Sequence, residues 1–201
     1  MQEDKLPRNF FKDNPVNEFS TAQLTYFQMV MLGLPELNDK ISNMANTLMK
    51  TSRLEECEQE KNRILGSDTA EEVIKHMRTI KNPQNRKLIV EKALTLQEDI
   101  MPLILKRLQT SAHDVFIETS AMIFANGDMK YVEQLFNIFT EIRSPYARSA
   151  TSIVFGVKKR TDYTSLLLKQ YMLIKQEEPD KDYEQGPLLA LHLIHGELER
   201  S

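Results

Sequence analysis

The sequence predicts an all-α protein: a right-handed α-solenoid of stacked antiparallel helix pairs behind an N-terminal helical cap. Three observations support this prediction. Glycine is scarce, with 6 among 201 residues, and the common residue types are good helix formers. Apolar residues recur at intervals of three and four, the period of a helix buried on one face. Helix-start signals recur about every thirty residues, as they do in stacked helical arrays.

The composition restricts the class of protein. Hydrophobic residues make up 41% and charged residues 27%, a balance typical of a globular chain rather than a disordered one. The formal net charge of −3 argues against general electrostatic binding to nucleic acid or to an anionic membrane. Cys57 is the only cysteine, which suits a reducing compartment. No stretch has the length and apolarity of a membrane span or a secretory signal, so we expect a cytoplasmic protein.

The first third of the chain divides into an irregular arm over residues 1–18 and N-terminal helices over 19–66. One helix begins at Ser20, whose hydroxyl can accept a hydrogen bond from the first turn, and Gln23 completes a capping box. The apolar stripe of this helix comprises Leu24, Phe27, Val30 and Met31.

A second helix begins at Pro35, because proline is tolerated at the first helical position. Neither glycine nor proline occurs over residues 36–65, which predicts one long helix that can kink near Thr51. The apolar spacing slips by about three residues between its halves. We therefore favour a helix packed on the following repeats, and keep a coiled-coil homodimer through 36–65 as the alternative. The apolar face of the first half comprises Leu37, Ile41, Met44 and Leu48.

Two interleaved series of helix starts define a repeat region over residues 67–201, expected to form one continuous domain with 19–66. Asp, Asn and Ser side chains accept hydrogen bonds from the free N–H groups of a first turn, and Asp also favours the positive end of the helix dipole. Glu71 is expected to complete a capping box with Asp68. The first series is Asp68, Asp99, Asp128 and Asp162, and the second is Asn82, Ser111, Ser144 and Gly186.

These features resemble the HEAT and armadillo class of helical repeats over about residues 67–198. The resemblance is carried by the paired helices, by the aspartate before one helix of each pair, and by proline at Pro83, Pro145 and Pro187. The units are shorter than the roughly forty residues usual for that class. The tetratricopeptide pattern fits less well, since the chain has no tryptophan. The resemblance implies an α-solenoid and a binding role without specifying a partner.

No catalytic signature is present, and no nucleotide-binding motif indicates a cofactor. His192 and His195 lie three residues apart, so they share one face of a helix and could share a metal ion. No H-E-x-x-H motif or third ligand accompanies them, and we favour a helix that closes the array. Cys57 lies in a glutamate-rich run, which disfavours a reactive thiolate. The chain is therefore predicted not to be an enzyme.

Basic residues gather around the stretch Asp128–Val157. We favour the interpretation that they neutralise the negative end of a helix dipole, and the alternative is an anion- or partner-binding ridge. The five residues are Arg143, Arg148, Lys158, Lys159 and Arg160. Arg86, Lys87, Lys106 and Arg107 could extend such a ridge onto adjacent repeats.

The functional hypothesis is a non-enzymatic interaction module that binds a protein or peptide along one face of the helical array. The first competing hypothesis is a nucleic-acid or phosphate-ligand binder that uses the basic cluster, although an acidic chain without aromatic–basic interleaving is a poor match to nucleic acid. The second is a metal-dependent enzyme centred on His192 and His195.

Overall fold

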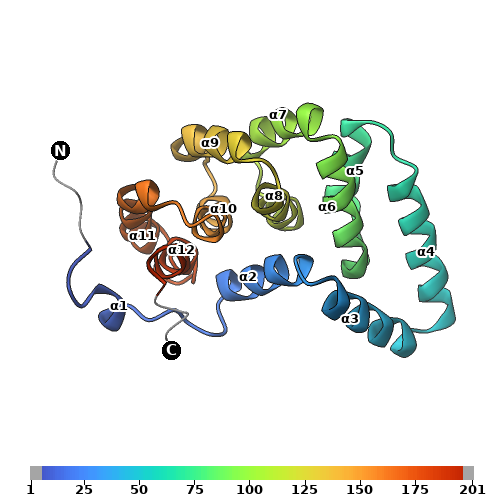
Figure 1. Ribbon diagram of the computed structural model, residues 1–201, viewed down its shortest axis with the longest axis horizontal. Helices are drawn as coiled ribbons and strands as arrows, with labels where there is room; N and C mark the ends of the chain where they lie inside the picture. Colours follow the sequence, from blue (N-terminus) through green and yellow to red (C-terminus); the bar gives the residue numbers. More distant parts are fainter. Residues whose placement is uncertain (1–5, 197–201) are drawn as a thin grey trace.

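The computed structural model describes residues 6–196, and within that range the chain forms helices and no strands (Figure 1). The all-α prediction is confirmed. Three short 3₁₀ turns are η1 (Pro83–Asn85), η2 (Phe139–Glu141) and η3 (Thr161–Tyr163). The α-helices are α1 (Phe10–Asp13), α2 (Thr21–Leu32), α3 (Pro35–Leu48), α4 (Thr51–Leu65), α5 (Ala70–Thr79), α6 (Arg86–Thr95), α7 (Gln97–Leu108), α8 (Asp114–Asn126), α9 (Met129–Ile138), α10 (Pro145–Val157), α11 (Thr164–Glu177) and α12 (Gln185–His195).

From α5 onward the helices form two rows. The helices α6, α8, α10 and α12 pack side by side in one row, and α5, α7 and α9 form the other. The chain passes from row to row, so helices two apart in order become neighbours. In α10 every residue from Ala147 to Gly156 is buried, and a helix buried on all sides lies at the centre of a fold. The even-numbered row is therefore the core of the protein.

Only part of the N-terminal segment caps one end of the array: α4 packs on α6 there (Figure 1), whereas α2 does not. Instead α2 lies across α8, α10 and α12 (Figure 1). The Thr21 N–H donates to Asp182 Oδ2 over 2.8 Å, and the Tyr171 hydroxyl donates to Asn14 Oδ1 over 2.7 Å. Segments from opposite ends of the sequence thus pack directly together, which an open stack of repeats would not produce. The structure shows an all-α fold with two helical rows and does not show a solenoid.

The single long helix expected over residues 36–65 is two helices, so that prediction is wrong. Met49 and Lys50 both adopt extended backbone conformations, and they separate α3 from α4. The break turns the chain so that α4 packs on α6 and η1. Tertiary packing therefore overrides the helix propensity of an uninterrupted segment.

Two of the serine helix starts are confirmed. The Ser20 hydroxyl accepts the Gln23 N–H over 3.1 Å, and the Ser144 hydroxyl accepts the Ala147 N–H over 3.2 Å. Pro145 follows Ser144 at the first position of α10, as expected.

Other starts are displaced by one or two residues. The capping box of α5 consists of Thr69 and Glu72 rather than Asp68 and Glu71. Helix α8 is capped by His113 rather than Ser111, through a ring nitrogen that accepts a backbone N–H. Helices α7 and α12 begin at Gln97 and Gln185, before the predicted Asp99 and Gly186, while Asp162 lies in η3 ahead of α11. The helices therefore follow one another at the predicted spacing, but the residue that caps a helix is often a neighbour of the predicted one.

Glycine permits the close approach of α10 and α12. A Cβ atom added to Gly156 would lie 2.6 Å from Ala190 Cα, and one added to Gly186 would lie 2.2 Å from the Ser149 carbonyl oxygen. Real Cβ atoms do not tolerate such distances to backbone, so the two helices can touch only through these glycines.

Gly156→Ala is expected to destabilise the protein by about 1–3 kcal/mol, because the added methyl group forces α12 away from α10. Thermal or urea unfolding followed by circular dichroism measures the change. Gly33→Ala is the matched control, since the nearest atom to its added Cβ is at an ordinary 3.4 Å. Equal effects of the two substitutions would contradict the role assigned to the α10–α12 contact.

Candidate functional site

The five basic residues predicted to cluster occupy opposite ends of α10. Arg143 precedes the first residue of the helix, and Lys158, Lys159 and Arg160 follow its last. A helix of 13 residues is about 20 Å long. The five side chains therefore do not form one binding surface, although they are close in sequence.

Arg148 is a structural residue. Its side chain is buried, its Nη1 donates to the Ile142 carbonyl oxygen over 3.1 Å, and its Nη2 forms an ion pair with the Glu177 carboxylate. The guanidinium thus joins the start of α10 to the end of α11. Glu177 itself is exposed, but removing it would leave the buried guanidinium without its carboxylate partner, which is destabilising.

The cations after α10 are also engaged within the chain. Lys158 Nζ donates to the Gly127 carbonyl oxygen over 3.0 Å. Burial lowers the pKa of Lys158, against a weaker opposing attraction from Asp128. Arg160 donates two hydrogen bonds to the Asp162 carboxylate, at 2.9 and 2.6 Å, and these bonds raise its pKa. Lys159 is exposed and adopts a positive φ of 51° where the chain leaves the helix.

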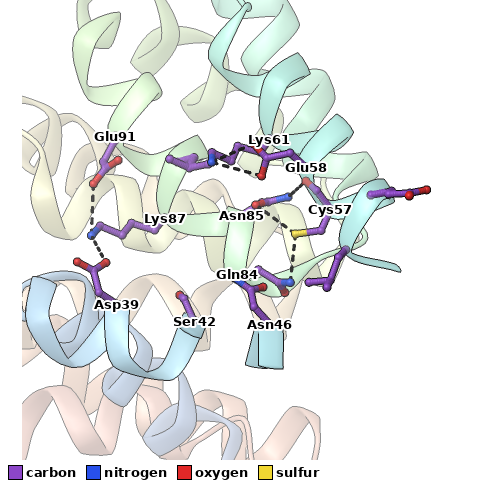
Figure 2. Close-up of a pocket in the computed structure, with 13 residues that line it drawn as sticks. Asp39, Ser42, Asn46, Cys57, Glu58, Lys61, Gln84, Asn85, Lys87 and Glu91 are labelled. Carbon is purple, nitrogen blue, oxygen red and sulfur yellow. Dashed lines mark hydrogen bonds and ion pairs between the residues drawn. The ribbon is translucent and has the colours of Figure 1, made fainter. Parts of the chain in front are cut away.

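Of the residues expected to extend the ridge, two are paired with acidic groups. Lys87 Nζ lies 3.8 Å from the Asp39 carboxylate and 3.7 Å from that of Glu91 (Figure 2). Arg86 is paired with the Glu118 carboxylate of α8. Lys106 and Arg107 are exposed at the end of α7.

The histidine pair holds the N-terminal arm. His192 is buried, its Nε2 lies 3.0 Å from the Asn14 carbonyl oxygen, and its ring centroid lies 4.5 Å from that of Phe11. The His195 ring lies 5.5 Å from the same phenyl ring. Over residues 6–196, no group of three or more His, Cys, Asp and Glu side chains is arranged to hold a metal ion.

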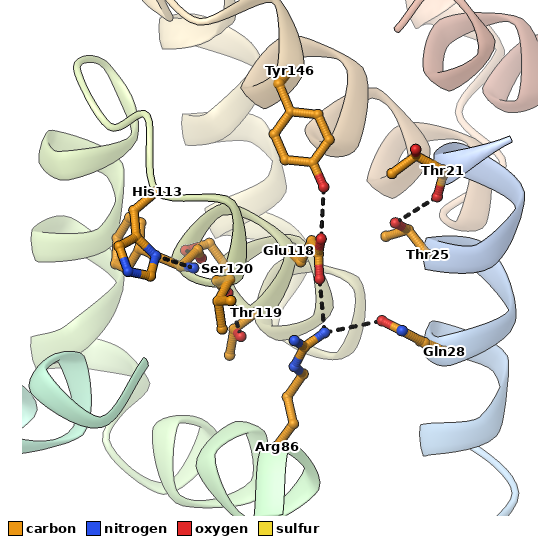
Figure 3. Close-up of polar contacts among 11 residues, drawn as sticks. Thr21, Thr25, Gln28, Arg86, His113, Glu118, Thr119, Ser120 and Tyr146 are labelled. Carbon is orange, nitrogen blue, oxygen red and sulfur yellow. Dashed lines mark hydrogen bonds and ion pairs between the residues drawn. The ribbon is translucent and has the colours of Figure 1, made fainter. Parts of the chain in front are cut away.

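A polar ladder that sequence reasoning missed crosses the start of the even-numbered helices (Figure 3). Arg86 Nη1 donates to Glu118 Oε2 over 2.9 Å and to Gln28 Oε1 over 3.1 Å. The Tyr146 hydroxyl donates to Glu118 Oε1 over 2.6 Å. Burial, and then the bond to this carboxylate, raises the pKa of Tyr146. The ladder joins α6, α8 and α10 to α2.

The roughly thirty-residue repeat is the sequence signal from which this ladder could have been predicted. Arg86 and Glu118 are 32 residues apart, and Glu118 and Tyr146 are 28 apart. Both separations approximate one repeat, so corresponding residues of successive repeats become neighbours.

A polar cavity of about 550 Å³ lies between α3, α4 and α6 (Figure 2). The Gln84 side-chain amide donates to Cys57 Sγ over 3.1 Å, and Cys57 Sγ in turn contacts Asn85 Oδ1 at 3.7 Å. Lys61 and Lys87, which also line the cavity, both have carboxylate partners. Cys57 is buried at its edge with amide neighbours, and the arrangement holds α4 to η1.

Beside Cys57, the buried carboxylate of Glu60 holds the turn before α6. It accepts hydrogen bonds from the Lys81 and Asn82 backbone N–H groups and from the Asn82 and Asn85 side-chain amides, at 2.8–3.1 Å. Burial alone would raise its pKa, but the hydrogen bonds together outweigh burial and lower the pKa of Glu60 below its ordinary 4.5. Glu60 thus supplies hydrogen-bond acceptors for the N–H groups of this turn.

The most extensive uncovered feature is an apolar face along α2 and α3. None of the described side chains of α3 is buried, and Met44 and Leu48 are 66% and 85% exposed. In α2 the buried residues are Ala22, Thr25 and Met29, so the helix packs through a different face from the predicted apolar stripe. The exposed apolar residues from Phe19, which precedes the N-cap of α2, to the end of α3 are Phe19, Leu24, Phe27, Val30, Leu34, Leu37, Ile41, Met44 and Leu48.

Glu60→Gln is expected to destabilise the protein by about 1–3 kcal/mol at neutral pH, because at least one of the four N–H donors then faces the NH₂ group of glutamine, itself a donor. A carboxylate with a lowered folded pKa stabilises the fold above its unfolded value. The difference from the wild type should therefore be full at neutral pH and shrink as the pH falls from about 4.5 through the lowered pKa of Glu60. Urea unfolding across that pH range measures it. Glu58→Gln, an exposed neighbour in α4, is the control and should show no comparable loss.

No helix in the described part of the chain combines the length and apolarity needed to cross a membrane. Comparison of the chain with protein-family models, with curated proteins and with solved structures finds no match. The function is therefore argued from the chain's own surfaces.

Proposed function

We propose that the chain is a cytoplasmic, non-enzymatic interaction module, an α-solenoid-like array of helical repeats that binds a protein partner. The binding surface is the uncovered apolar face of α2 and α3. The observation that supports this most directly is that α3, a helix of 14 residues, exposes Leu37, Ile41, Met44 and Leu48 on one side. Exposed contiguous apolar surface of this kind marks interaction sites.

The face along α8, α10 and α12 is not the docking surface. In helical-repeat proteins a partner typically lies along one face of the stacked helices, as the sequence led us to expect. Here α2 already lies across these three helices. The Thr21 and Asn17 backbone N–H groups donate to the Asp182 and Gln185 side chains and hold the start of α2. The chain's own N-terminal segment covers this face, and the available surface is the other side of that segment.

The partner surface that fits is an amphipathic helix with an apolar seam. The α3 residues Leu37, Ile41, Met44 and Leu48 follow the alternating spacing of four and three that packs against another helix. No charged residue occurs from Ile41 to Met49, so the contact relies on apolar burial. The nine apolar side chains are on average a little more than half exposed. If a fully exposed large side chain supplies about 200 Å², they together offer roughly 1,000 Å², comparable with the roughly 800 Å² per partner of a standard interface.

A cavity behind α3 supplies a place for an anchoring side chain. It measures about 480 Å³, lies between α2, α3, α6 and α8, and is lined by Met31, Leu32, Ile41 and Met122 among others. Methionine side chains adapt to different apolar groups. Ile41 belongs both to the cavity and to the exposed stripe, so one partner helix can engage both.

We favour a helix of another protein over a second copy of this chain. The stripe on α3 covers two heptads, whereas a coiled coil is indicated by about three or four sustained heptads. The alternative use of the five basic residues as a phosphate or nucleic-acid site is not favoured, because Arg148 and Arg160 are already bound to carboxylates.

A photoreactive amino acid in place of Met44 should form a specific crosslink to a partner in extracts of the native host. Mass spectrometry of the adduct should identify an amphipathic helical segment. Ile41→Asp in the same chain should abolish the adduct, since a carboxylate in the apolar contact is costly to bury. The control position is Met172 on α11, which is 52% exposed.

The two positions give distinguishable outcomes. An adduct between two copies of this chain would identify the homodimer as the occupant of the stripe and overturn the preference for another protein. Adducts formed equally from positions 44 and 172 would contradict a specific docking surface on α3.

A further inference from the structure

A basic hollow lies at the edge of the array where α5 and α7 end and α8 begins. It has a volume of about 450 Å³ and is lined by Arg78, Arg107, His113, Phe116 and residues 110–112. A neighbouring hollow of about 360 Å³ shares Arg78, Arg107 and His113, and adds Lys75. Lysine and arginine side chains from two different helices therefore converge on one place.

These cations lack compensating groups among the described residues. Arg78, Arg107 and Lys75 are exposed, and over residues 6–196 none of their side chains takes part in an ion pair or hydrogen bond. Glu71 is the one carboxylate that lines either hollow, and it borders only the smaller. In this respect they differ from Arg148, Arg160 and Lys87, whose charges are neutralised within the chain. Like charges at close quarters repel, and a bound anion would relieve that repulsion.

His113 adds a ring N–H donor to the hollow. Its Nδ1 accepts the Phe116 N–H over 3.3 Å (Figure 3), so the proton of the neutral ring resides on Nε2. Thr110 and Ser111 line the same hollow, and the Ser111 hydroxyl oxygen accepts the His113 backbone N–H over 3.3 Å. The hollow is thus lined by two arginines, a histidine and two hydroxyl-bearing residues, all of which can donate hydrogen bonds.

We propose that this hollow binds a tetrahedral oxyanion, such as the phosphate of a phosphomonoester. Guanidinium groups present paired N–H donors whose geometry matches phosphate oxygens. Of the five basic residues predicted from the sequence, Arg143 lies nearest, since its backbone N–H donates to the Gln109 carbonyl oxygen at the start of the same turn. The site is separate from the α2–α3 face and does not depend on it.

Titration of the isotopically labelled full chain with inorganic phosphate, at constant ionic strength, tests the proposal by NMR. The backbone amide signals of residues 110–113 should shift and saturate. In the double variant Arg78→Gln/Arg107→Gln the affinity should fall by roughly tenfold or more, because two charge-assisted contacts are lost. Lys106→Gln removes the same charge from the residue beside Arg107, which does not line the hollow, and should bind phosphate as the wild type does.

Titration with O-phosphoserine and with serine distinguishes the source of the oxyanion. Shifts of the same amides by phosphoserine and not by serine support a phosphomonoester ligand, whereas shifts by inorganic phosphate alone support the free ion. Equal shifts on adding sodium chloride, or an unchanged titration of the double variant, would overturn the site. Both arginines are exposed, so the remaining spectrum should show that the double variant is folded.

Discussion

The packing of α10 between α8 and α12 is the constraint on which the rest of the structure depends. Ten consecutive residues of α10 are buried, so this helix has no solvent-facing side. Gly156 and Gly186 let it approach α12 to backbone contact. Interiors packed at this density leave no room for an added methyl group without displacement of neighbouring atoms. The position of α12 therefore sets the surface on which the N-terminal segment lies.

That surface explains why α3 is left uncovered. The start of α2 is held near the C-terminal helices by Asp182 and Gln185, whereas α4 is held at the opposite end of the protein by Glu60 and its amide donors. Helix α3 connects these two fixed points, with a cavity between it and each neighbouring group of helices. Its length and path are set by the span, so its apolar face stays in solvent and is available to a partner.

The charges of the protein divide into two groups with different consequences. Glu60, Arg148 and the Glu118 ladder hold helices together, because a charge partly removed from water needs a partner to offset its desolvation. Arg78 and Arg107 stay in water, need no internal partner, and converge on a hollow. Closeness in the sequence does not show which charged residues are paired within the protein and which are not. Most of the basic residues around α10 have partners within the chain. The two arginines left unpaired among residues 6–196, Arg78 and Arg107, lie on helices about thirty residues apart in the sequence.

The sequence by itself determined the helical class, the roughly thirty-residue period and starts such as Ser20 and Ser144, because spacing and capping are local properties of the chain. Only the tertiary structure decided that α2 returns across α8, α10 and α12, and that the 36–65 segment breaks at Met49. The return of α2 depends on contacts between residues more than one hundred positions apart, such as Thr21 with Asp182. The break depends on contacts of α4 with the turn before α6, such as Glu60 with Asn85. An amphipathic pattern shows that a helix has an apolar face, as for Leu37 to Leu48. Whether that face meets the core or solvent depends on where the helix is anchored.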